Sequence, residues 1–154
     1  ESVETYRRTL GDEHPTVMRG MNNLAMWLLD AGDYKAAEPL LRQVLDVRIK
    51  SLGSEHAEVA GTKILLAGLL VDTGRNEEAL AMASGNKEIY ASEFGEEHWR
   101  TASAAVVEGA ALASLDRRDE ARKLLLPGYE VLRKNTEALP WFVNSAARWR
   151  AKIT

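Results

Sequence analysis

The chain has 154 residues, of which 45% are apolar and 28% are charged, and its formal net charge at neutral pH is −3. These values are ordinary for one compact soluble domain or array, and the lack of a basic excess argues against nucleic acid or an anionic membrane as partner. Cysteine is absent, which excludes disulfides, thiolate metal ligands and cysteine nucleophiles. The longest apolar run, residues 64–71, is too short to cross a bilayer, and we expect a cytoplasmic protein.

The first ten residues have the pattern of the last turns of a helix, so we expect the sequence to begin in mid-structure, as a piece of a longer protein would. The short segment that follows them contains glycine, acidic residues and histidine, and it recurs with a constant step of 42 residues, at 10–15, 52–57 and 94–99. A fixed step of this size is typical of arrays that stack one supersecondary unit repeatedly.

Each interval between these segments holds two predicted helices. In the first interval, a helix over 16–31 is predicted from apolar residues at helical spacing, which are Val17, Met21, Leu24, Leu28 and Ala31. Gly32 is expected to end this helix, and Asp33 to cap the next one, which runs from Tyr34 to about Leu52. The buried stripe of that second helix is predicted to be Ala37, Leu41, Val44, Leu45 and Ile49.

Two later helices contain a residue that disfavours helix. Gly85 interrupts the long helix of the second interval, and Pro127 stands at the equivalent place in the third. We expect a bend at each of them rather than an end, although a proline inside a helix costs about 3 kcal/mol. After the third interval, Pro140 suits the first turn of a further helix over 140–153, which we expect to cap the array and to pack against the third pair.

The pattern Asn22-Asn23-Leu24-Ala25, then Gly32-Asp33-Tyr34, then Ala37-Glu38-Pro39-Leu40-Leu41, closed by Leu-Gly-x-Glu-His, resembles the long tetratricopeptide repeats of kinesin light chains and of their bacterial relatives. The resemblance covers residues 1 to about 134. It implies an all-α fold, a right-handed α-solenoid of antiparallel helix pairs, in one array. The predicted parts are the end of a preceding helix (1–10), three repeats (15–52, 57–94 and 99–134) and a capping helix (140–153).

The sequence offers no foothold for catalysis or for a cofactor. The three histidines, at positions 14, 56 and 98, occupy equivalent places in stacked repeats, about 8–10 Å apart or more, so they cannot share a metal ion, and we interpret them as structural parts of the linkers. Adjacent carboxylates such as Glu77 and Glu78 point in different directions from a helix, which is typical of a solvated face. No phosphate-binding loop or nucleophile elbow is present. We therefore expect no enzyme.

The resemblance implies that the first helix of each pair lines a concave groove. The positions that it predicts to meet a ligand, called here the groove positions, are Arg19, Asn22, Asn23, Met26, Asp30, Gly61, Ile64, Gly68, Val71 and Val106. The same faces also carry Leu29, Asp72, Ser103, Ala110, Ala113 and Ser114. Asn22 and Asn23 can each donate and accept hydrogen bonds, which suits an extended peptide backbone, while a structural hydrogen bond to a neighbouring helix is an equal alternative for Asn23.

The apolar run 64–71 must be covered on its groove side as well. A partner peptide, another copy of the chain, or the C-terminal helix folding back are the three alternatives. Trp27 and Trp99 are expected to serve in packing. Glu108 stands where the other repeats have leucine, so either the third repeat packs differently or Glu108 pairs with a nearby arginine such as Arg148 or Arg150.

The predicted function is a protein–protein interaction module that binds a peptide or helix in a partly apolar groove. The alternative is a structural role, with homodimerisation through the groove or through an open end of the array.

Overall fold

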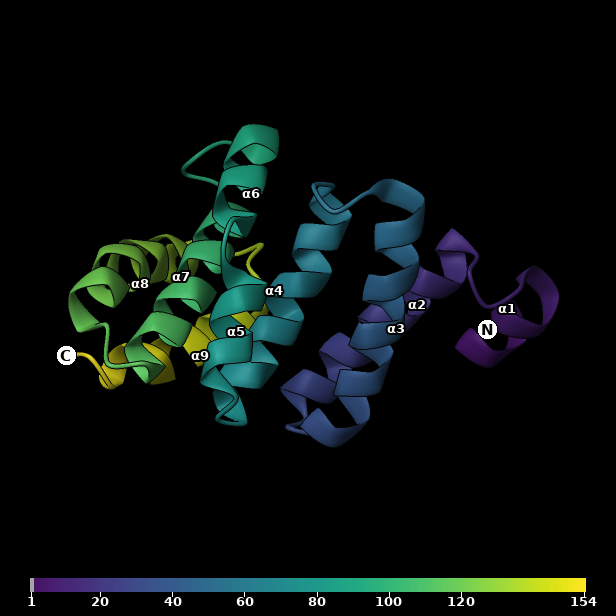
Figure 1. Ribbon diagram of the computed structural model, residues 1–154, viewed down its shortest axis with the longest axis horizontal. Helices are drawn as coiled ribbons and strands as arrows, with labels where there is room; N and C mark the ends of the chain where they lie inside the picture. The colour runs from purple at the N-terminus through teal and green to yellow at the C-terminus, as the bar shows by residue number, and fades with distance from the viewer. Residues whose placement is uncertain (1) are drawn as a thin grey trace.

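The computed structural model describes residues 2–154, and within them the chain consists of nine α-helices and no strand. They are α1 (Val3–Leu10), α2 (Pro15–Asp30), α3 (Tyr34–Leu52), α4 (Ala57–Asp72), α5 (Asn76–Ala83), α6 (Asn86–Phe94), α7 (Trp99–Ser114), α8 (Arg118–Lys134) and α9 (Pro140–Ala151). Figure 1 shows α2 beside α3, α4 beside α5, and α7 beside α8, following one another along an elongated array. The predicted all-α solenoid of helix pairs is confirmed.

The same cap begins the first helix of each pair. The histidine before the helix accepts a hydrogen bond at Nδ1 from the backbone N–H two residues later, at 3.2 Å for His14, 3.1 Å for His56 and 3.1 Å for His98. Each cap satisfies one of the N–H groups that the first turn leaves without a partner. The histidines therefore have a structural role in the linkers, as the repeat pattern predicted. Asp33 caps α3 in the same way, accepting from the Ala36 N–H at 3.1 Å.

The two helix-disfavouring residues have different effects. At Gly85 the backbone adopts the left-handed conformation, with φ of +84°, and the helix of the second pair ends at Ala83 and restarts at Asn86. The expected bend at Gly85 is wrong, because a residue with positive φ cannot continue an α-helix. At Pro127, by contrast, α8 continues from Arg118 to Lys134 without an end.

The buried stripe of α2 differs from the predicted one. The buried residues are Val17, Met18, Met21, Ala25 and Leu29. Leu24 is 43% exposed, whereas its equivalent Leu66, one repeat later, is fully buried. The reason lies in the preceding helix: α3 has 19 residues and packs along α4, but α1 has only 8, and its Val3 and Tyr6 cover the first half of α2 alone.

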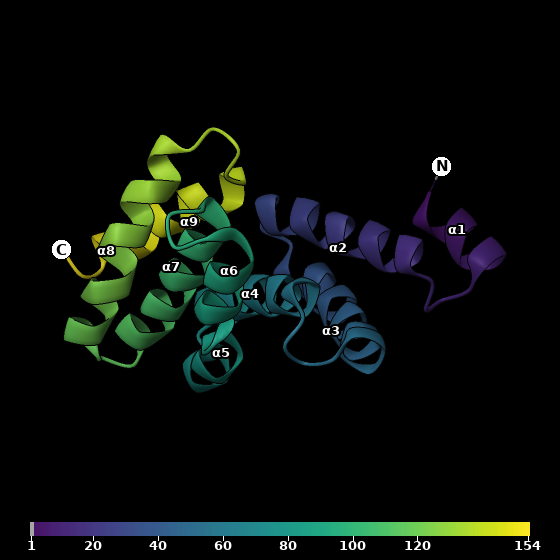
Figure 2. The same cartoon turned by 90° about the horizontal axis from the view of Figure 1, so that it is seen from above.

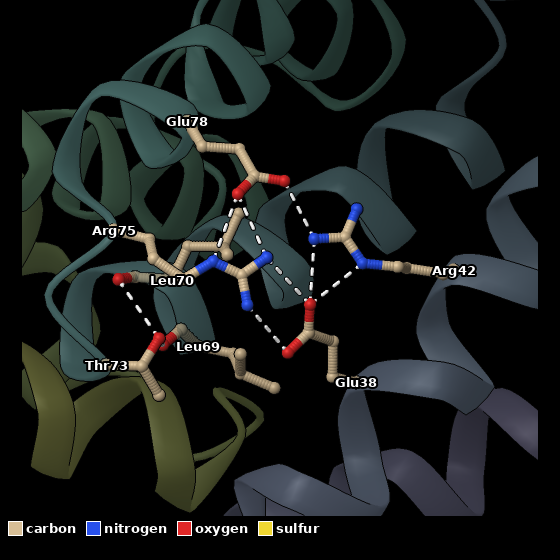
Figure 3. Close-up of polar contacts among 7 residues, drawn as sticks. All are labelled: Glu38, Arg42, Leu69, Leu70, Thr73, Arg75 and Glu78. Atoms are coloured by element: carbon tan, nitrogen blue, oxygen red, sulfur yellow. Dashed lines mark hydrogen bonds and ion pairs between the residues drawn. The ribbon is translucent and has the colours of Figure 1, made fainter.

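Ion pairs join the second helices of repeats one and two. In Figure 2 these helices, α3 and α5, lie on the side of the array away from α9. Figure 3 shows the four residues of this inter-repeat network, two carboxylates and two guanidinium groups. Arg42 contacts Glu38 at 2.8 Å and Glu78 at 2.7 Å, and Arg75 contacts Glu38 at 2.8 Å and Glu78 at 2.9 Å. Each charge thus has two partners of opposite sign, one of them across the repeat boundary.

The network gives the stability of the array a pH dependence. Hydrogen bonds from Arg75 and then Arg42 hold the pKa of Glu38 below its ordinary value, and hydrogen bonds from Arg42 and then Arg75 do the same for Glu78. Because these pKa values are lower in the folded state, the stabilisation is present above the unfolded-state pKa and is lost as the pH falls through the folded-state pKa.

We predict that Glu38→Gln lowers the free energy of unfolding by about 1 kcal/mol near neutral pH, a modest value because the network is partly exposed to solvent. The measurement is urea unfolding of wild type and variant at about pH 7 and about pH 3. The difference between the two proteins is expected to shrink at the lower pH. If wild type and Glu38→Gln differ in free energy of unfolding as much at about pH 3 as at about pH 7, the role of the ionised Glu38 is contradicted.

Candidate functional site

The C-terminal helix occupies much of the concave face. Seen from above, the start of α9 lies beside the C-terminal end of α2, and the helix continues past α7 and α8 (Figure 2). Its Trp141 ring lies against Gly68 of α4, so closely that a methyl group at Gly68 would be 2.3 Å from Trp141 Cη2. Of the three alternatives predicted to cover the groove side of residues 64–71, the structure shows the C-terminal helix at Gly68.

Asp72, at the end of α4, anchors α9. Its Oδ1 accepts a hydrogen bond from the Trp149 indole N–H at 2.8 Å, and its Oδ2 accepts one from Arg148 Nη2 at 2.7 Å. Oδ2 also accepts from the Tyr34 hydroxyl at 2.8 Å, and burial together with this bond raises the pKa of Tyr34. The Asp72 side chain is only 10% exposed, so it joins α3, α4 and α9 through a nearly buried charge.

Docked α9 and tight packing remove three groove positions from the surface. Gly68 lies under the Trp141 ring, Val71 is 5% exposed, and Val106 is fully buried. Val106 faces α8 rather than the groove, since a methyl group at Gly128 would be 2.7 Å from Val106 Cγ2. The prediction that these three residues meet a ligand is therefore corrected: in this structure other parts of the chain cover them.

The open remainder of the groove is a cavity of about 490 Å³, called here the mouth cavity. It contains six groove positions, Arg19, Asn22, Asn23, Met26, Gly61 and Ile64, and also Ser103. The sequence did not single out several further lining residues, which come from α3, α6, α7 and α9: Arg48, Tyr90, Glu93, Phe94, Arg100 and Phe142. A ligand in the mouth cavity would touch all three repeats and the capping helix.

Arg48 organises the wall of the mouth cavity between α2 and α4. Its Nη1 donates to Thr62 Oγ1 at 2.8 Å, and its Nη2 lies 3.1 Å from Glu58 Oε2. Burial lowers the pKa of Arg48, which Glu58 partly opposes. Thr62 Oγ1 in turn lies 3.4 Å from Asn22 Oδ1, within reach of a hydrogen bond. The one hydroxyl proton of Thr62 is shared between this contact and the Glu58 carbonyl oxygen at 3.1 Å, so Arg48 and Thr62 form the polar wall beside Asn22.

Tyr90 and Arg100 form the opposite wall. The Tyr90 hydroxyl sits over Gly61, where a methyl group would be 2.7 Å from Tyr90 Oη, and it makes no hydrogen bond within residues 2–154. Burial raises the pKa of Tyr90 to about 12, so the hydroxyl stays protonated near neutral pH and can donate. The Arg100 guanidinium lies 4.8 Å from the Phe94 ring centroid and 5.4 Å from the Trp99 ring centroid.

A second cavity, of about 270 Å³, lies between α2 and the start of α9 and is called here the Trp27 cavity. Its lining residues are Met26, Trp27, Leu29, Asp30, Leu65, Leu139, Pro140 and Trp141. Three of them, Met26, Leu65 and Leu139, line the mouth cavity as well, so the two cavities adjoin. Trp27 is 78% exposed, so its expected packing role is wrong; Trp99 is half-buried.

Glu108 does not have the arginine partners that were expected. Arg148 binds Asp72, and the Arg150 guanidinium lies over the Tyr129 ring at 4.6 Å from its centroid. Glu108 is instead half-buried on the side of Lys87 and Glu88, and burial raises its pKa, with Glu88 adding to the shift and Lys87 opposing it. Glu108 belongs to neither cavity.

The described part of the chain contains no cluster of three or more histidine and carboxylate side chains that could hold a metal ion. None of the helices from α1 to α9 is long and apolar enough to cross a membrane.

Comparison with known proteins agrees with this architecture. Residues 17–58 match the model of the tetratricopeptide repeat family. Two crystal structures of a candidate kinesin light chain of Podosopora anserina with nearly identical TPR-like repeats, one of them a variant, are similar over 97% of this chain and 73% of that chain. The sequence identity is 25% in both cases, and the TM-scores are 0.73 and 0.72. No curated protein matches by sequence.

We predict that Asp72→Asn loosens α9. The substitution removes the charge that Arg148 neutralises and weakens three hydrogen bonds at a nearly buried position, for an expected cost of about 2–3 kcal/mol. Hydrogen exchange of the α9 amides is expected to accelerate, and the tryptophan emission of the chain to shift to longer wavelength as Trp149 becomes exposed. Asp46→Asn, an exposed carboxylate of α3, is the control. Wild-type protection of α9 in the Asp72 variant would contradict the anchor.

We also predict that Gly68→Ala destabilises the protein by about 1–2 kcal/mol, because the methyl group displaces the Trp141 ring. The direction of this change in the free energy of unfolding is informative, because alanine in place of glycine inside a helix ordinarily stabilises the helix by about 1 kcal/mol. Urea unfolding checks the prediction. In a Trp141→Leu background, which lacks the ring, Gly68→Ala is expected to be neutral or stabilising; an equal loss in both backgrounds would refute the contact.

Proposed function

Since the chain is a tetratricopeptide repeat protein of the kinesin-light-chain-like type, a class of protein-interaction scaffolds, we propose that it binds a short extended segment of a partner protein in the mouth cavity. The observation that carries the proposal is a set of polar groups without partners around an apolar floor. In this role the protein carries out no catalytic step, needs no cofactor and acts in the cytoplasm.

Backbone groups of the segment would meet donors and acceptors that are already in place. Asn23 is exposed and forms no hydrogen bond to the residues that the structure describes. The Tyr90 hydroxyl is likewise unbonded, and Asn22 is held from behind by Thr62. An extended peptide leaves its N–H and C=O groups open to such side chains, so groups fixed before binding lose little conformational freedom when it binds.

Side chains of the segment would meet an apolar floor and a basic rim. Ile64 and Leu65 are nearly fully buried, and Phe94 and Phe142 complete the floor. On the rim, Arg19, Arg100 and Glu93 form no ion pair among the described residues, so two unpaired cations stand beside one unpaired carboxylate, whereas Glu58 is paired with Arg48. The mouth cavity thus suits a segment that combines an apolar side chain with a carboxylate.

Peptide selection tests the proposal. Random twelve-residue peptides displayed on phage are panned against the immobilised chain, and the affinity of synthetic winners is measured by titration calorimetry. We predict that Arg19→Glu combined with Asn22→Ala weakens these peptides by about tenfold or more, since the pair removes one charged and one neutral contact. Both residues lie at the cavity edge, so the melting temperature is expected to change little.

Lys35→Glu, at an exposed position of α3 outside both cavities, is the charge-matched control and is expected to bind as wild type does. Failure to enrich any peptide would contradict the proposal. So would a dimer in sedimentation that buries the mouth cavity and dissociates in the Arg19 and Asn22 variant, because this outcome favours the self-assembly alternative.

A further inference from the structure

Asp30, in the Trp27 cavity, is a carboxylate without a partner in an apolar setting. It is the only charged residue among those that line the cavity, and it forms no ion pair or hydrogen bond with any residue from 2 to 154. It is also the last residue of α2, where a negative charge opposes the helix dipole. Asp30 is exposed, so water solvates this charge, but neither a described side chain nor the helix dipole stabilises it.

The chain itself shows what a carboxylate at this position can bind. Asp30 and Asp72 are 42 residues apart and end equivalent helices. Asp72 accepts hydrogen bonds from Arg148 and from the Trp149 indole, both on α9, which lies in the groove. In the third repeat the equivalent residue is Ser114, which has no charge. The carboxylate of repeat two is therefore occupied by a guanidinium, and that of repeat one is free.

We propose that the Trp27 cavity takes a basic side chain, arginine or lysine, of the partner segment, with its charge on Asp30 and its stem along the Trp27 ring. This inference rests on the proposed function, because the segment that fills the mouth cavity reaches the Trp27 cavity past Met26, Leu65 and Leu139. The bound segment then carries its acidic side chain towards Arg19 and Arg100 and its basic one towards Asp30, which fixes its direction in the groove.

The chemistry of the cavity favours a cation with an apolar stem over a purely apolar group. Leu29 and Leu65 form a nearly fully buried floor, and the exposed Trp27 ring offers most of the apolar surface to methylene groups. The face of Trp27, 78% exposed, is available for a cation–π contact. An apolar side chain would remove water from Asp30 without replacing its hydrogen bonds, which is unfavourable.

The test compares peptide selections on wild type and on Asp30→Lys, with Asp46→Lys of α3 as the matched control. Both substitutions lie at exposed positions, and a lysine at the end of α2 suits the helix dipole, so both variants are expected to fold. Wild type and the control are expected to enrich peptides with arginine or lysine at one fixed position. The Asp30 variant is expected to enrich aspartate or glutamate there instead.

A second measurement uses one winning peptide. Trp27→Ala is expected to weaken it by about tenfold, and replacing its basic residue by norleucine, which keeps the stem and removes the charge, should weaken it similarly. This inference is overturned if the selected peptides carry no basic residue, or if wild type and Asp30→Lys select the same peptides. Either result leaves the proposed function standing.

Two further outcomes are decisive. If wild type enriches no peptide, the proposed function fails and this inference fails with it. If wild type forms a dimer in sedimentation that Trp27→Ala converts to a monomer, a second copy of the chain occupies the cavity, and the basic side chain is refuted.

Discussion

The Asp72 carboxylate is the constraint on which the shape of the groove depends. It accepts hydrogen bonds from Tyr34 of α3 and from Arg148 and Trp149 of α9, at 2.7–2.8 Å. A nearly buried carboxylate needs such donors, because its desolvation is unfavourable without them. Meeting this need brings α9 across α4, presses Trp141 onto Gly68, and divides the concave face into the mouth cavity and the Trp27 cavity.

The two sides of the array are joined by different physical means. On the side of α3 and α5, the inter-repeat network uses paired charges that remain partly in contact with water (Figure 3). On the concave side, the joint is apolar, with Trp141, Phe142 and Trp149 nearly or fully buried around one hydrogen-bonded carboxylate. Exposed ion pairs tolerate small shifts between helices, whereas a ring packed on a glycine does not. The concave joint therefore sets the relative position of repeat two and α9.

Much of the fold could be predicted because the 42-residue step places glycine, histidine and the apolar residues at equivalent points of each pair. The same argument located α9, since Pro140 begins a helix one step after the third linker. The 42-residue step could not predict which equivalent positions differ in burial or in backbone conformation. Leu24 and Leu66 share a repeat position, yet only Leu66 is buried, because burial depends on the length of the preceding helix. Gly85 ends its helix since its φ is positive, a property of three-dimensional context.

The candidate site was predicted in part for a related reason. Arg19, Asn22 and Asn23 follow from the resemblance, which implies that one face of the first helix lines the groove. The opposite wall contains Tyr90 of α6 and Arg100 of α7, whose side chains line the mouth cavity. The sequence did contain a signal for Arg48. The equivalent residues of the next two repeats are Tyr90 and Leu132. A buried arginine where other repeats have an aromatic or aliphatic residue marks a place where a charge is needed.

The interruption at Gly85 has a consequence for cooperativity within the array. Helices α5 and α6 have 8 and 9 residues, each too short to be stable without neighbours, so their order depends on packing against α4 and α7. In a solenoid, stability is approximately a sum over units and the interfaces between them, and a unit divided in two contributes an additional low-energy opening. Since α6 carries Tyr90, Glu93 and Phe94, one wall of the mouth cavity belongs to this opening unit. Local unfolding of the nine-residue α6 would therefore open this wall of the mouth cavity while α2, α4 and α9 keep their places.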